Sequence, residues 1–353
     1  MFRRSCSKTS AMLRDRIVIG ASAGGVPALE TLVGSLPADL GAAVFIVMHL
    51  QPDALSRLPQ ILQRRCRLQV THAKEGERIE RGRVYVASPD QHLLLEGDHL
   101  RLTRGPRENR SRPAVDTLFR SAAYSHGDRV IGVILSGALD DGTAGLWSVK
   151  ERGGTTVVQD PDEAEYDSMP RSAIQHVQVD HVVALKEMGP LLVKLTTTPV
   201  EKHEAAMSKE LEIETKIALE GRALELGVLG LGPVTPYTCP ECHGVLVALK
   251  EGGVPRFRCH TGHAYSINTL LAEVTGYVEE ALWGGIRAIE ESMLLLRALA
   301  RHIRDDKAKD PGLADLLDEK AKDAQRRADL VRQALSTHQT LSEDNVSTLK
   351  TGG

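Results

Sequence analysis

The chain has 353 residues, 42% of them apolar, which is enough to bury a sizeable core and to form about two domains. Its net charge of −3 and its 3% of aromatic residues argue against nucleic acid as a partner, because nucleic-acid binding needs basic surfaces or stacking platforms. The longest apolar stretch, near residues 41–50, is too short for a membrane helix, which takes about 20 residues, so no membrane insertion is expected.

Residues 1–15 form a basic leader without the apolar core and cleavage site of a secretory signal, which predicts a flexible segment and a cytoplasmic location. From residue 16 to 198, short β-branched runs alternate with helical patterns. This alternation predicts an α/β domain built on a doubly wound, mostly parallel sheet with helices on both faces. A Gly-Asp turn between apolar runs at 93–102 predicts a hairpin inserted between the two halves of the sheet.

The individual elements of this domain follow from apolar runs and from helix-start signals. The predicted strands are residues 16–20, 43–48, 68–73, 83–88, 130–135, 155–159 and 181–185, and the predicted helices begin near Pro27, Leu55, Pro113, Gly142 and Pro170.

The remaining chain divides into four expected segments. Residues 199–235 read as a polar linker and a helix, and residues 236–266 as a small zinc-ribbon-like hairpin that turns at Gly252-Gly253. In residues 267–337, apolar positions recur three and four residues apart with a break at Asp310-Pro311-Gly312, which predicts a helical hairpin. We expect its apolar stripe to pack within the hairpin or on the zinc unit rather than on a separate partner. Residues 338–353 are expected to be disordered.

The first predicted strand ends in the sequence Gly20-Ala21-Ser22-Ala23-Gly24, directly before a helix. A G-x-S-x-G turn between a strand and a helix lifts the serine above the sheet and leaves a backbone amide, here that of Ala23, free to bind an oxyanion. The rival interpretation is a dinucleotide-binding loop, but that loop requires glycine where Ser22 stands and an acidic residue where His49 follows the second strand. Ser22 is therefore predicted to be a nucleophile.

Two further polar residues follow predicted strands. His49 comes directly after residues 43–48, and Asp141 lies just beyond residues 130–135. The carboxyl ends of parallel strands meet at one edge of a sheet, where open α/β folds place their sites. Because a hydroxyl needs an imidazole base and a carboxylate to orient that base, we predict a Ser22, His49, Asp141 triad that needs no cofactor for catalysis. Asp140 is the competing acid.

A cluster of cysteines and histidines follows the linker. Cys239 and Cys242 form a Cys-x2-Cys pair, and Cys259 and His263 follow across a predicted hairpin. Four such ligands suit tetrahedral Zn²⁺, and with no position left open for water the site is predicted to be structural. His260 is the alternative fourth ligand, and reduced thiols without metal are the alternative to a metal site.

Six segments in order resemble the catalytic domain of the chemotaxis protein-glutamate methylesterase (CheB) family. They are IVIGASAGG, VMHLQPD, EGERIERGRVYVASPDQHLLLEGDHL, RSRPAVDTLF, VIGVILSGALDDGTAGL and SMPRSAI, which together span nearly all of residues 16–198. The resemblance implies a doubly wound sheet with a triad at Ser22, His49 and Asp141. It implies hydrolysis of γ-glutamyl methyl esters on the cytoplasmic helices of chemoreceptors, deamidation of particular glutamines, and chemosensory signalling proteins as further partners.

The sequence departs from the family pattern in two ways. Family enzymes usually carry an N-terminal receiver domain, whereas this chain begins its catalytic segment near residue 16. The resemblance therefore does not extend to control by phosphorylation of a receiver domain in the same chain. Members commonly have a Gly-Met-Gly turn before the catalytic aspartate, where this chain has Gly137-Ala138-Leu139. The backbone amide of Ala138 is still expected to serve as a second oxyanion donor, because an amide does not depend on its side chain.

Arginines crowd the loop before Pro113, and Arg107, Arg110 and Arg112 are candidates for steering a glutamate-rich receptor helix, with a solvated loop as the equal alternative. The remaining histidines lack supporting patterns and are expected to be structural. Two other functions compete with a methylesterase: an adaptor with a vestigial hydrolase that binds through its C-terminal region, and a serine hydrolase of another ester.

Overall fold

The computed structural model describes residues 12–49, 56–200, 207–249, 253–305 and 311–338. The chain forms two compact units, residues 1–269 and 270–353. Several predictions concern residues outside the described ranges. They are most of the leader, the helix start near Leu55, the turn positions Gly252 and Asp310, and nearly all of the C-terminal tail.

In the first unit, the elements are β1 (Arg16–Ala21), α1 (Gly25–Ser35), β2 (Ala43–Met48), α2 (Leu58–Gln63), β3 (Gln69–His72), β4 (Arg83–Val86), β5 (His92–Glu96), β6 (His99–Thr103), α3 (Val115–His126), β7 (Val130–Ile134), α4 (Thr143–Glu151), β8 (Thr155–Gln159), α5 (Ser168–His176), β9 (His181–Val183), α6 (Leu185–Thr197), α7 (Lys209–Glu220), β10 (Val234–Thr238), β11 (Val245–Leu249), β12 (Arg256–Cys259) and β13 (Ala264–Ser266). The helices α8 (Ile267–Asp305) and α9 (Pro311–Thr337) follow.

The first unit is organised around a seven-stranded parallel sheet of order β3-β4-β2-β1-β7-β8-β9. The chain starts at the central strand, builds one half outward through β2, and then returns to build the other half from β7. The antiparallel β5-β6 hairpin lies in the chain between the two halves. The predicted α/β fold with a mostly parallel sheet and an inserted hairpin is confirmed. The reversal of strand order places the carboxyl ends of β2, β1 and β7 next to one another, the position at which such sheets bind ligands.

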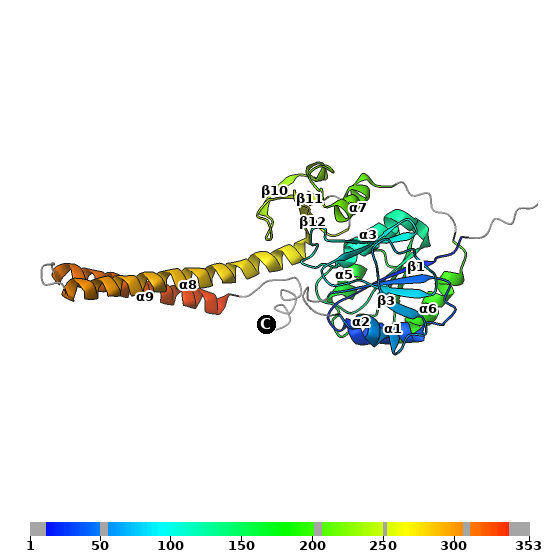
Figure 1. The fold of residues 1–353 in the computed structure, drawn as a ribbon, viewed down its shortest axis with the longest axis horizontal. Helices are drawn as coiled ribbons and strands as arrows, with labels where there is room; N and C mark the ends of the chain where they lie inside the picture. Colours follow the sequence, from blue (N-terminus) through cyan, green and yellow to red (C-terminus); the bar gives the residue numbers. More distant parts are fainter. Residues whose placement is uncertain (1–11, 50–55, 201–206, 250–252, 306–310, 339–353) are drawn as a thin grey trace, which may run out of the picture. The chain divides into compact units, whose positions relative to one another are not determined.

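Both faces of the sheet are covered by helices, as its apolar strands require. Along β1, Ile17 and Ile19 pack in one core with α1, α2 and α6, while Val18 packs in the other core with α3, α4, α5 and the β5-β6 hairpin. Figure 1 shows α1, α2 and α6 along one side of the sheet and α3 along the other.

Helix α6 was not among the predicted elements. It places Met188, Leu192 and Thr196 four residues apart on its buried side, but Pro190 interrupts the pattern that would mark a helix. Pro190 is exposed, so its ring disturbs only the outer face. Gly189 permits a close approach to α1, because a Cβ atom there would lie 1.9 Å from the Oγ atom of Ser35.

The cysteine-rich segment forms an antiparallel sheet of order β10-β11-β12-β13, which has more strands than the single hairpin expected. We call residues 234–266 the Cys/His module. It belongs to the same compact unit as the parallel sheet, and the helix α7 that precedes it packs against α3.

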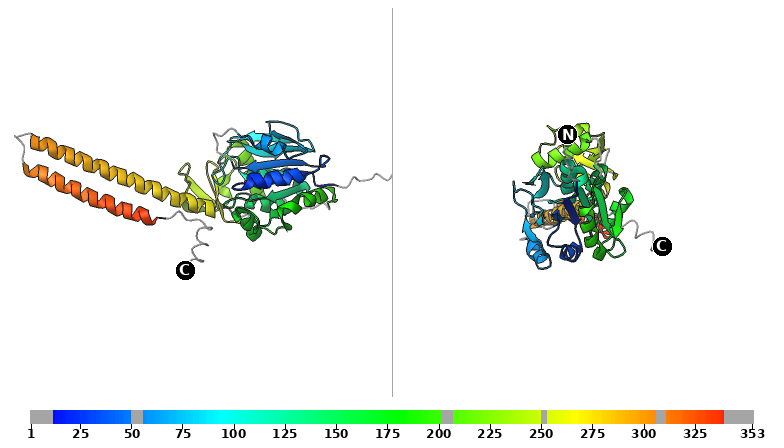
Figure 2. Two further views of the ribbon diagram at one scale, coloured as in Figure 1. Left: turned by 90° about the horizontal axis from the view of Figure 1, so that it is seen from below. Right: turned by 90° about the vertical axis from the view of Figure 1, so that its right-hand side faces the viewer.

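The second unit is a helical hairpin in which α8 and α9 lie side by side (Figure 2). Its core contains Met293, Ala300 and Ile303 from α8 and Ala314 and Ala321 from α9. The expected apolar stripe therefore packs within the hairpin along this stretch. Among the described helices of the chain, none combines the length and apolarity that crossing a bilayer requires.

Candidate active site

Ser22 lies in a tight turn between β1 and α1. Its amide donates to the carbonyl oxygen of Ser136 (3.0 Å), and its carbonyl accepts from the amide of Gly25 (2.9 Å), which starts the helix. Gly24 adopts φ 68°, a left-handed conformation that favours glycine, and a Cβ atom there would lie 2.7 Å from the Oγ atom of Ser136. The small residues of this turn thus allow the sharp change of direction that presents Ser22 at the end of the sheet.

The structure brings Ser22, His49 and Asp141 together as a hydrogen-bonded triad. The Oγ atom of Ser22 lies 3.0 Å from Nδ1 of His49, and Nε2 of His49 lies 2.7 Å from Oδ2 of Asp141. These residues follow β1, β2 and β7, three strands that are neighbours in the sheet. With Nε2 donating to the carboxylate, Nδ1 is left unprotonated and can accept the proton of the serine hydroxyl. The arrangement has the geometry of a nucleophile, a base and an orienting acid.

The Asp141 carboxylate is 3% exposed and accepts four hydrogen bonds. Oδ2 accepts from His49 and from the amide of Val115 (2.7 Å), and Oδ1 accepts from Nδ2 of Asn109 (3.1 Å) and the amide of Asp116 (3.3 Å). Burial alone would raise the pKa of Asp141, but the donated hydrogen bonds hold its pKa below the ordinary value. Asp141 is thereby kept charged while it holds the imidazole.

Asp140, the competing acid, points to other partners. Its Oδ1 atom accepts from Oγ of Ser266 (2.6 Å), and its Oδ2 atom accepts from Nδ2 of Asn268 (3.2 Å). Burial raises the pKa of Asp140 to about 6 despite these hydrogen bonds, and the neighbouring charge of Asp141 adds to the rise. Within the described residues it makes no hydrogen bond to His49. The geometry therefore favours Asp141 as the residue that orients the imidazole.

Two backbone amides near Ser22 match the expected oxyanion donors. Within the described part of the chain, the amides of Ala23 and Ala138 donate to no acceptor. Gly137 brings the second of them close, because a Cβ atom at Gly137 would lie 3.0 Å from Cβ of Ser22. An oxyanion formed on a substrate bound to Ser22 would find free donors on this side of the turn.

The arginines proposed to steer a substrate have different surroundings. Arg112 is half-buried, binds the Asp90 carboxylate (2.6 Å) and donates to the carbonyl of Gly105 (2.9 Å), so it stabilises its own loop. Arg110 is exposed and Arg107 partly exposed.

The four predicted metal ligands lie together in the Cys/His module. The ligand atoms of Cys239, Cys242, Cys259 and His263 all lie within 4.8 Å of one another. The Sγ atoms of Cys242 and Cys259 are 3.6 Å apart, and Nδ1 of His263 lies 3.6 Å from Sγ of Cys259. Tetrahedral Zn²⁺ with Zn–S bonds of about 2.3 Å places its sulfur ligands about 3.8 Å apart, so this donor set fits that ion.

The surroundings of the cluster also suit a metal. Nε2 of His263 lies 3.3 Å from a carboxylate oxygen of Glu241, the type of partner that fixes a ligating imidazole, and the hydroxyl of Tyr265 lies 3.4 Å from Sγ of Cys239. His260, the alternative ligand, is not part of the cluster.

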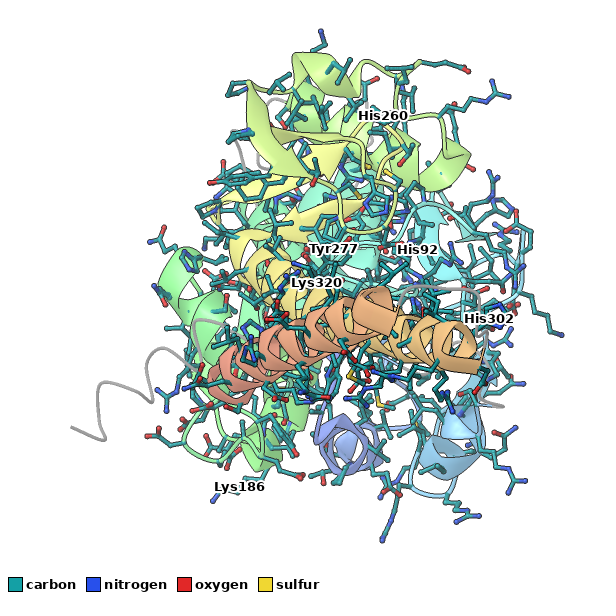
Figure 3. The ribbon with its side chains drawn as sticks, turned by 90° about the vertical axis from the view of Figure 1, so that its left-hand side faces the viewer. His92, Lys186, His260, Tyr277, His302 and Lys320 are labelled. Atoms are coloured by element: carbon teal, nitrogen blue, oxygen red, sulfur yellow. The ribbon has the colours of Figure 1, made fainter. Side chains whose placement is uncertain are left out.

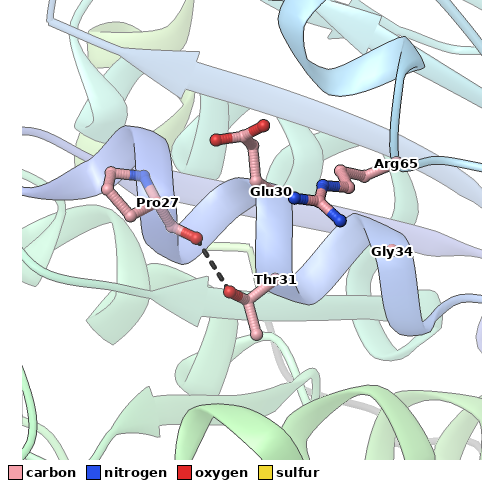
Figure 4. A pocket seen from close by; sticks show the side chains of 5 residues that line it. All are labelled: Pro27, Glu30, Thr31, Gly34 and Arg65. Atoms are coloured by element: carbon pink, nitrogen blue, oxygen red, sulfur yellow. Dashed lines mark hydrogen bonds between the residues drawn. The ribbon is translucent and has the colours of Figure 1, made fainter.

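Two further features, a buried histidine and an open pocket, lie apart from the triad. His92, labelled in Figure 3, is buried and contacts the carbonyl of Pro106 through Nε2 (2.9 Å), as expected for a structural histidine. An open pocket on α1 is lined by Pro27, Glu30, Thr31, Gly34 and Arg65, none of which belongs to the triad (Figure 4).

Sequence reasoning missed Asn109 and Asp116 as partners of the Asp141 carboxylate. Asp116 lies in the first turn of α3, is 2% exposed and also accepts from the amide of Gly145 (2.6 Å). Burial and the charge of Asp141 raise the pKa of Asp116 to about 7. The sequence signal for Asp116 was an acidic residue at a helix start, which usually indicates only a favourable dipole contact.

Comparison with known proteins agrees with this fold. The family model of the CheB methylesterase matches residues 17–192. A relative from Leptospira interrogans, named as a protein-glutamate methylesterase/protein-glutamine glutaminase, is 42% identical over 189 residues, which are 53% of this chain and 98% of that protein. A relative of the same kind from Geobacter metallireducens is 42% identical over 186 residues, 51% of either chain.

A solved structure is also similar to this chain. The catalytic domain of the CheB methylesterase from Thermotoga maritima has 32% sequence identity and a TM-score of 0.51, and the match covers 52% of this chain and all of that one. The matched part thus spans nearly the whole Leptospira protein but about half of the Geobacter protein. This chain belongs to the CheB methylesterase family.

Proposed function

We propose that residues 16–198 are a protein-glutamate methylesterase that hydrolyses γ-glutamyl methyl esters through Ser22, His49 and Asp141. The observation that carries the proposal is the continuous hydrogen-bonded path from Ser22 Oγ to Nδ1 of His49 (3.0 Å) and from Nε2 to Asp141 (2.7 Å). The names of the relatives supply the substrate class, because the geometry alone fits any accessible ester.

The reaction proceeds in two halves. The Oγ atom of Ser22 attacks the ester carbonyl carbon while its proton passes to Nδ1 of His49, and the oxyanion binds to the amides of Ala23 and Ala138. The bond to the methoxy group then breaks, and His49 returns the proton to the leaving group, which departs as methanol. Water then attacks the acyl carbon while its proton passes to His49, the bond between that carbon and Oγ of Ser22 breaks, and His49 returns the proton to Oγ as the glutamate carboxylate leaves. Attack on a glutamine amide would release ammonia by the same steps, which supports deamidation as a second activity.

The proposed substrates are methylated helices of chemoreceptors, whose glutamates lie on the cytoplasmic side of the membrane. The enzyme would therefore act in the cytoplasm, and its proposed partners there are chemosensory signalling proteins. Arg107 and Arg110 are proposed to attract such acidic helices through long-range electrostatics, which salt would screen.

We further propose that Cys239, Cys242, Cys259 and His263 bind a structural Zn²⁺. All four ligands come from the protein, so the ion would supply cross-linking of the Cys/His module rather than an activated water.

The experiment that tests the proposed reaction is methanol release from a methylated receptor fragment by the full chain and by Ser22→Ala. The variant should lose at least a thousandfold in rate, since nucleophile and base act as a unit. Undiminished methanol release by Ser22→Ala would refute the proposed role of Ser22. Labelling of Ser22 by a fluorophosphonate without any methanol release would favour a different ester as substrate, and absence of labelling would favour the adaptor.

A further inference from the structure

We propose that the Cys/His module braces the active site: Ser266 orients Asn109, and Asn109 positions the Asp141 carboxylate. This inference rests on the proposed role of Asp141 in ester hydrolysis. In this proposal Asn109 is a positioning residue, and the turnover rate depends on whether the Cys/His module holds its metal.

The first link is the side chain of Asn109, which is 8% exposed and has no unused hydrogen-bonding group. Its Oδ1 atom accepts from the amide of Ser266 (2.9 Å), and its Nδ2 atom donates to Asp141 (3.1 Å) and Asp116 (3.2 Å). A backbone amide can only donate, so Ser266 dictates which way the Asn109 amide group faces. The donors of that group are thereby directed at the catalytic carboxylate.

The second link is the backbone around Asn109. This residue has φ 47°, a left-handed conformation, and its amide donates to the carbonyl oxygen of Ala264 in β13 (2.9 Å). In return, the amide of Ala264 donates to the carbonyl of Arg107 (3.2 Å). Strand β13 therefore fixes both the backbone position and the side-chain orientation of Asn109.

The third link reaches the residue next to the catalytic acid. Besides its hydrogen bond from Ser266, the Asp140 carboxylate lies 3.4 Å from the hydroxyl of Thr269, and Oγ of Ser266 accepts from the amide of Thr269 (3.1 Å). Ser266 thus binds Asp140 directly through its hydroxyl and acts on Asp141 through the Asn109 side chain that its backbone amide contacts. A shift of β13 would disturb the Asp141 carboxylate from two sides.

The metal cluster holds the hairpin from which β13 emerges. Cys259 ends β12 and His263 precedes β13, and the amide of Cys259 donates to the carbonyl of His263 (2.9 Å). Beside these two ligands, Arg258 binds Glu108 (2.9 Å), the residue next to Asn109. A cross-link at Cys259 and His263 would therefore clamp the turn whose two arms contact residues 107–109.

The expected effect of Asn109→Ala is a fall in kcat of about tenfold to a hundredfold, the usual range for losing a hydrogen bond to a buried charged group. The KM should change less than twofold, because in the proposed reaction Asp141 acts on His49 and not on the substrate. A merely structural loss would lower the number of active molecules instead. Saturating fluorophosphonate labelling of Ser22, counted by mass spectrometry, separates the two effects because kcat can be expressed per labelled serine.

The test uses the full chain with zinc bound, the same protein stripped with a chelator, and Asn109→Ala in both states. Thr103→Ala is the matched control, because the Thr103 hydroxyl donates to the carbonyl of Ala218 (2.7 Å), tying the β5-β6 hairpin to α7 without touching either aspartate. We expect stripping to lower the rate of Ser22 labelling at least tenfold in the unsubstituted chain and by a smaller factor in Asn109→Ala. Thr103→Ala should keep the unsubstituted rate per labelled site.

Equal labelling rates and equal kcat per labelled serine in the unsubstituted chain, its stripped form and Asn109→Ala would overturn the brace while leaving the proposed esterase intact. If the unsubstituted chain labels at Ser22 but releases no methanol, the proposed substrate fails, and the labelling rates still decide the brace. A Thr103→Ala variant as slow as Asn109→Ala would show that any loosening of the unit slows Ser22, which also contradicts a specific role for Asn109.

Discussion

Replacing Arg258 by leucine should destabilise the first unit strongly, because Arg258 lies at the centre of a buried ionic cluster. Its guanidinium is 0% exposed and binds Glu108 (2.9 Å) and Glu214 (2.7 Å). Arg256 also binds Glu214 (2.6 Å), and Arg120 binds Glu108. Burial raises the cost of ionising Glu108, but the neighbouring arginines hold the pKa of its carboxyl below the ordinary value.

The magnitude follows from charge balance in that cluster. Three glutamates (Glu108, Glu210, Glu214) face three arginines (Arg120, Arg256, Arg258), so Arg258→Leu leaves one negative charge without compensation. Removing one partner of a buried pair costs about 3–5 kcal/mol. For a unit of this size that corresponds to a fall in Tm of roughly 10 °C.

The assay monitors thermal unfolding through the fluorescence of Trp147, which lies in α4 of the first unit. The protein carries Trp283→Phe, because Trp283 lies in α8 of the second unit and would add its own signal. The control is Arg101→Leu, which removes pairs with Glu75 and Glu96 at a side chain 37% exposed. Such a surface pair contributes at most about 1 kcal/mol. A loss in Arg258→Leu no larger than in Arg101→Leu would refute the buried ionic cluster as a source of stability.

Three further predictions concern acid, metal and packing. Burial lowers the pKa of His126 to about 4, so between that value and about 6.5 this residue binds fewer protons in the folded state than in the unfolded state, and its contribution to stability should fall by roughly 3 kcal/mol as the pH drops through this range. Urea unfolding should therefore show that the full chain loses stability relative to His126→Gln on acidification, and an unchanged difference between the two would contradict a buried, neutral His126. Cys259→Ser should lose the zinc that the unsubstituted chain and His260→Ala retain, as measured by elemental analysis after gel filtration, and equal zinc in all three would contradict the proposed ligand set. Gly20→Ala should cost about 1–3 kcal/mol in denaturant unfolding, because the new Cβ atom would lie 2.2 Å from Cγ1 of Val115, and an unchanged midpoint would show that α3 can move away.

Much of the parallel sheet could be predicted from the sequence because its central strands are buried on both faces. The runs at β1, β2 and β7 are therefore continuously apolar, and the residues after each run gather at one edge. The same reasoning placed Ser22, His49 and Asp141 near one another before any distance was known.

The attachment of the Cys/His module could not be predicted in this way. Cysteine spacing indicated which residues could share a metal, but Glu108, Glu214 and Arg258 look like ordinary surface charges in the sequence. Arg258 and Glu108 are 150 residues apart in the chain, and only the folded unit shows that they are buried together. The role of Asn109 was hidden for the same reason, since its partners come from a strand that no local pattern links to it.

The most direct test of the central claim is to trap the acyl-enzyme. A methylated receptor peptide is mixed with the full chain, quenched in acid within one turnover, and digested for mass spectrometry. The proposed reaction predicts an adduct equal to the peptide minus methanol on the fragment that contains Ser22, and no adduct in Ser22→Ala. Methanol released at the unsubstituted rate by Ser22→Ala, or an adduct on another residue, would contradict it.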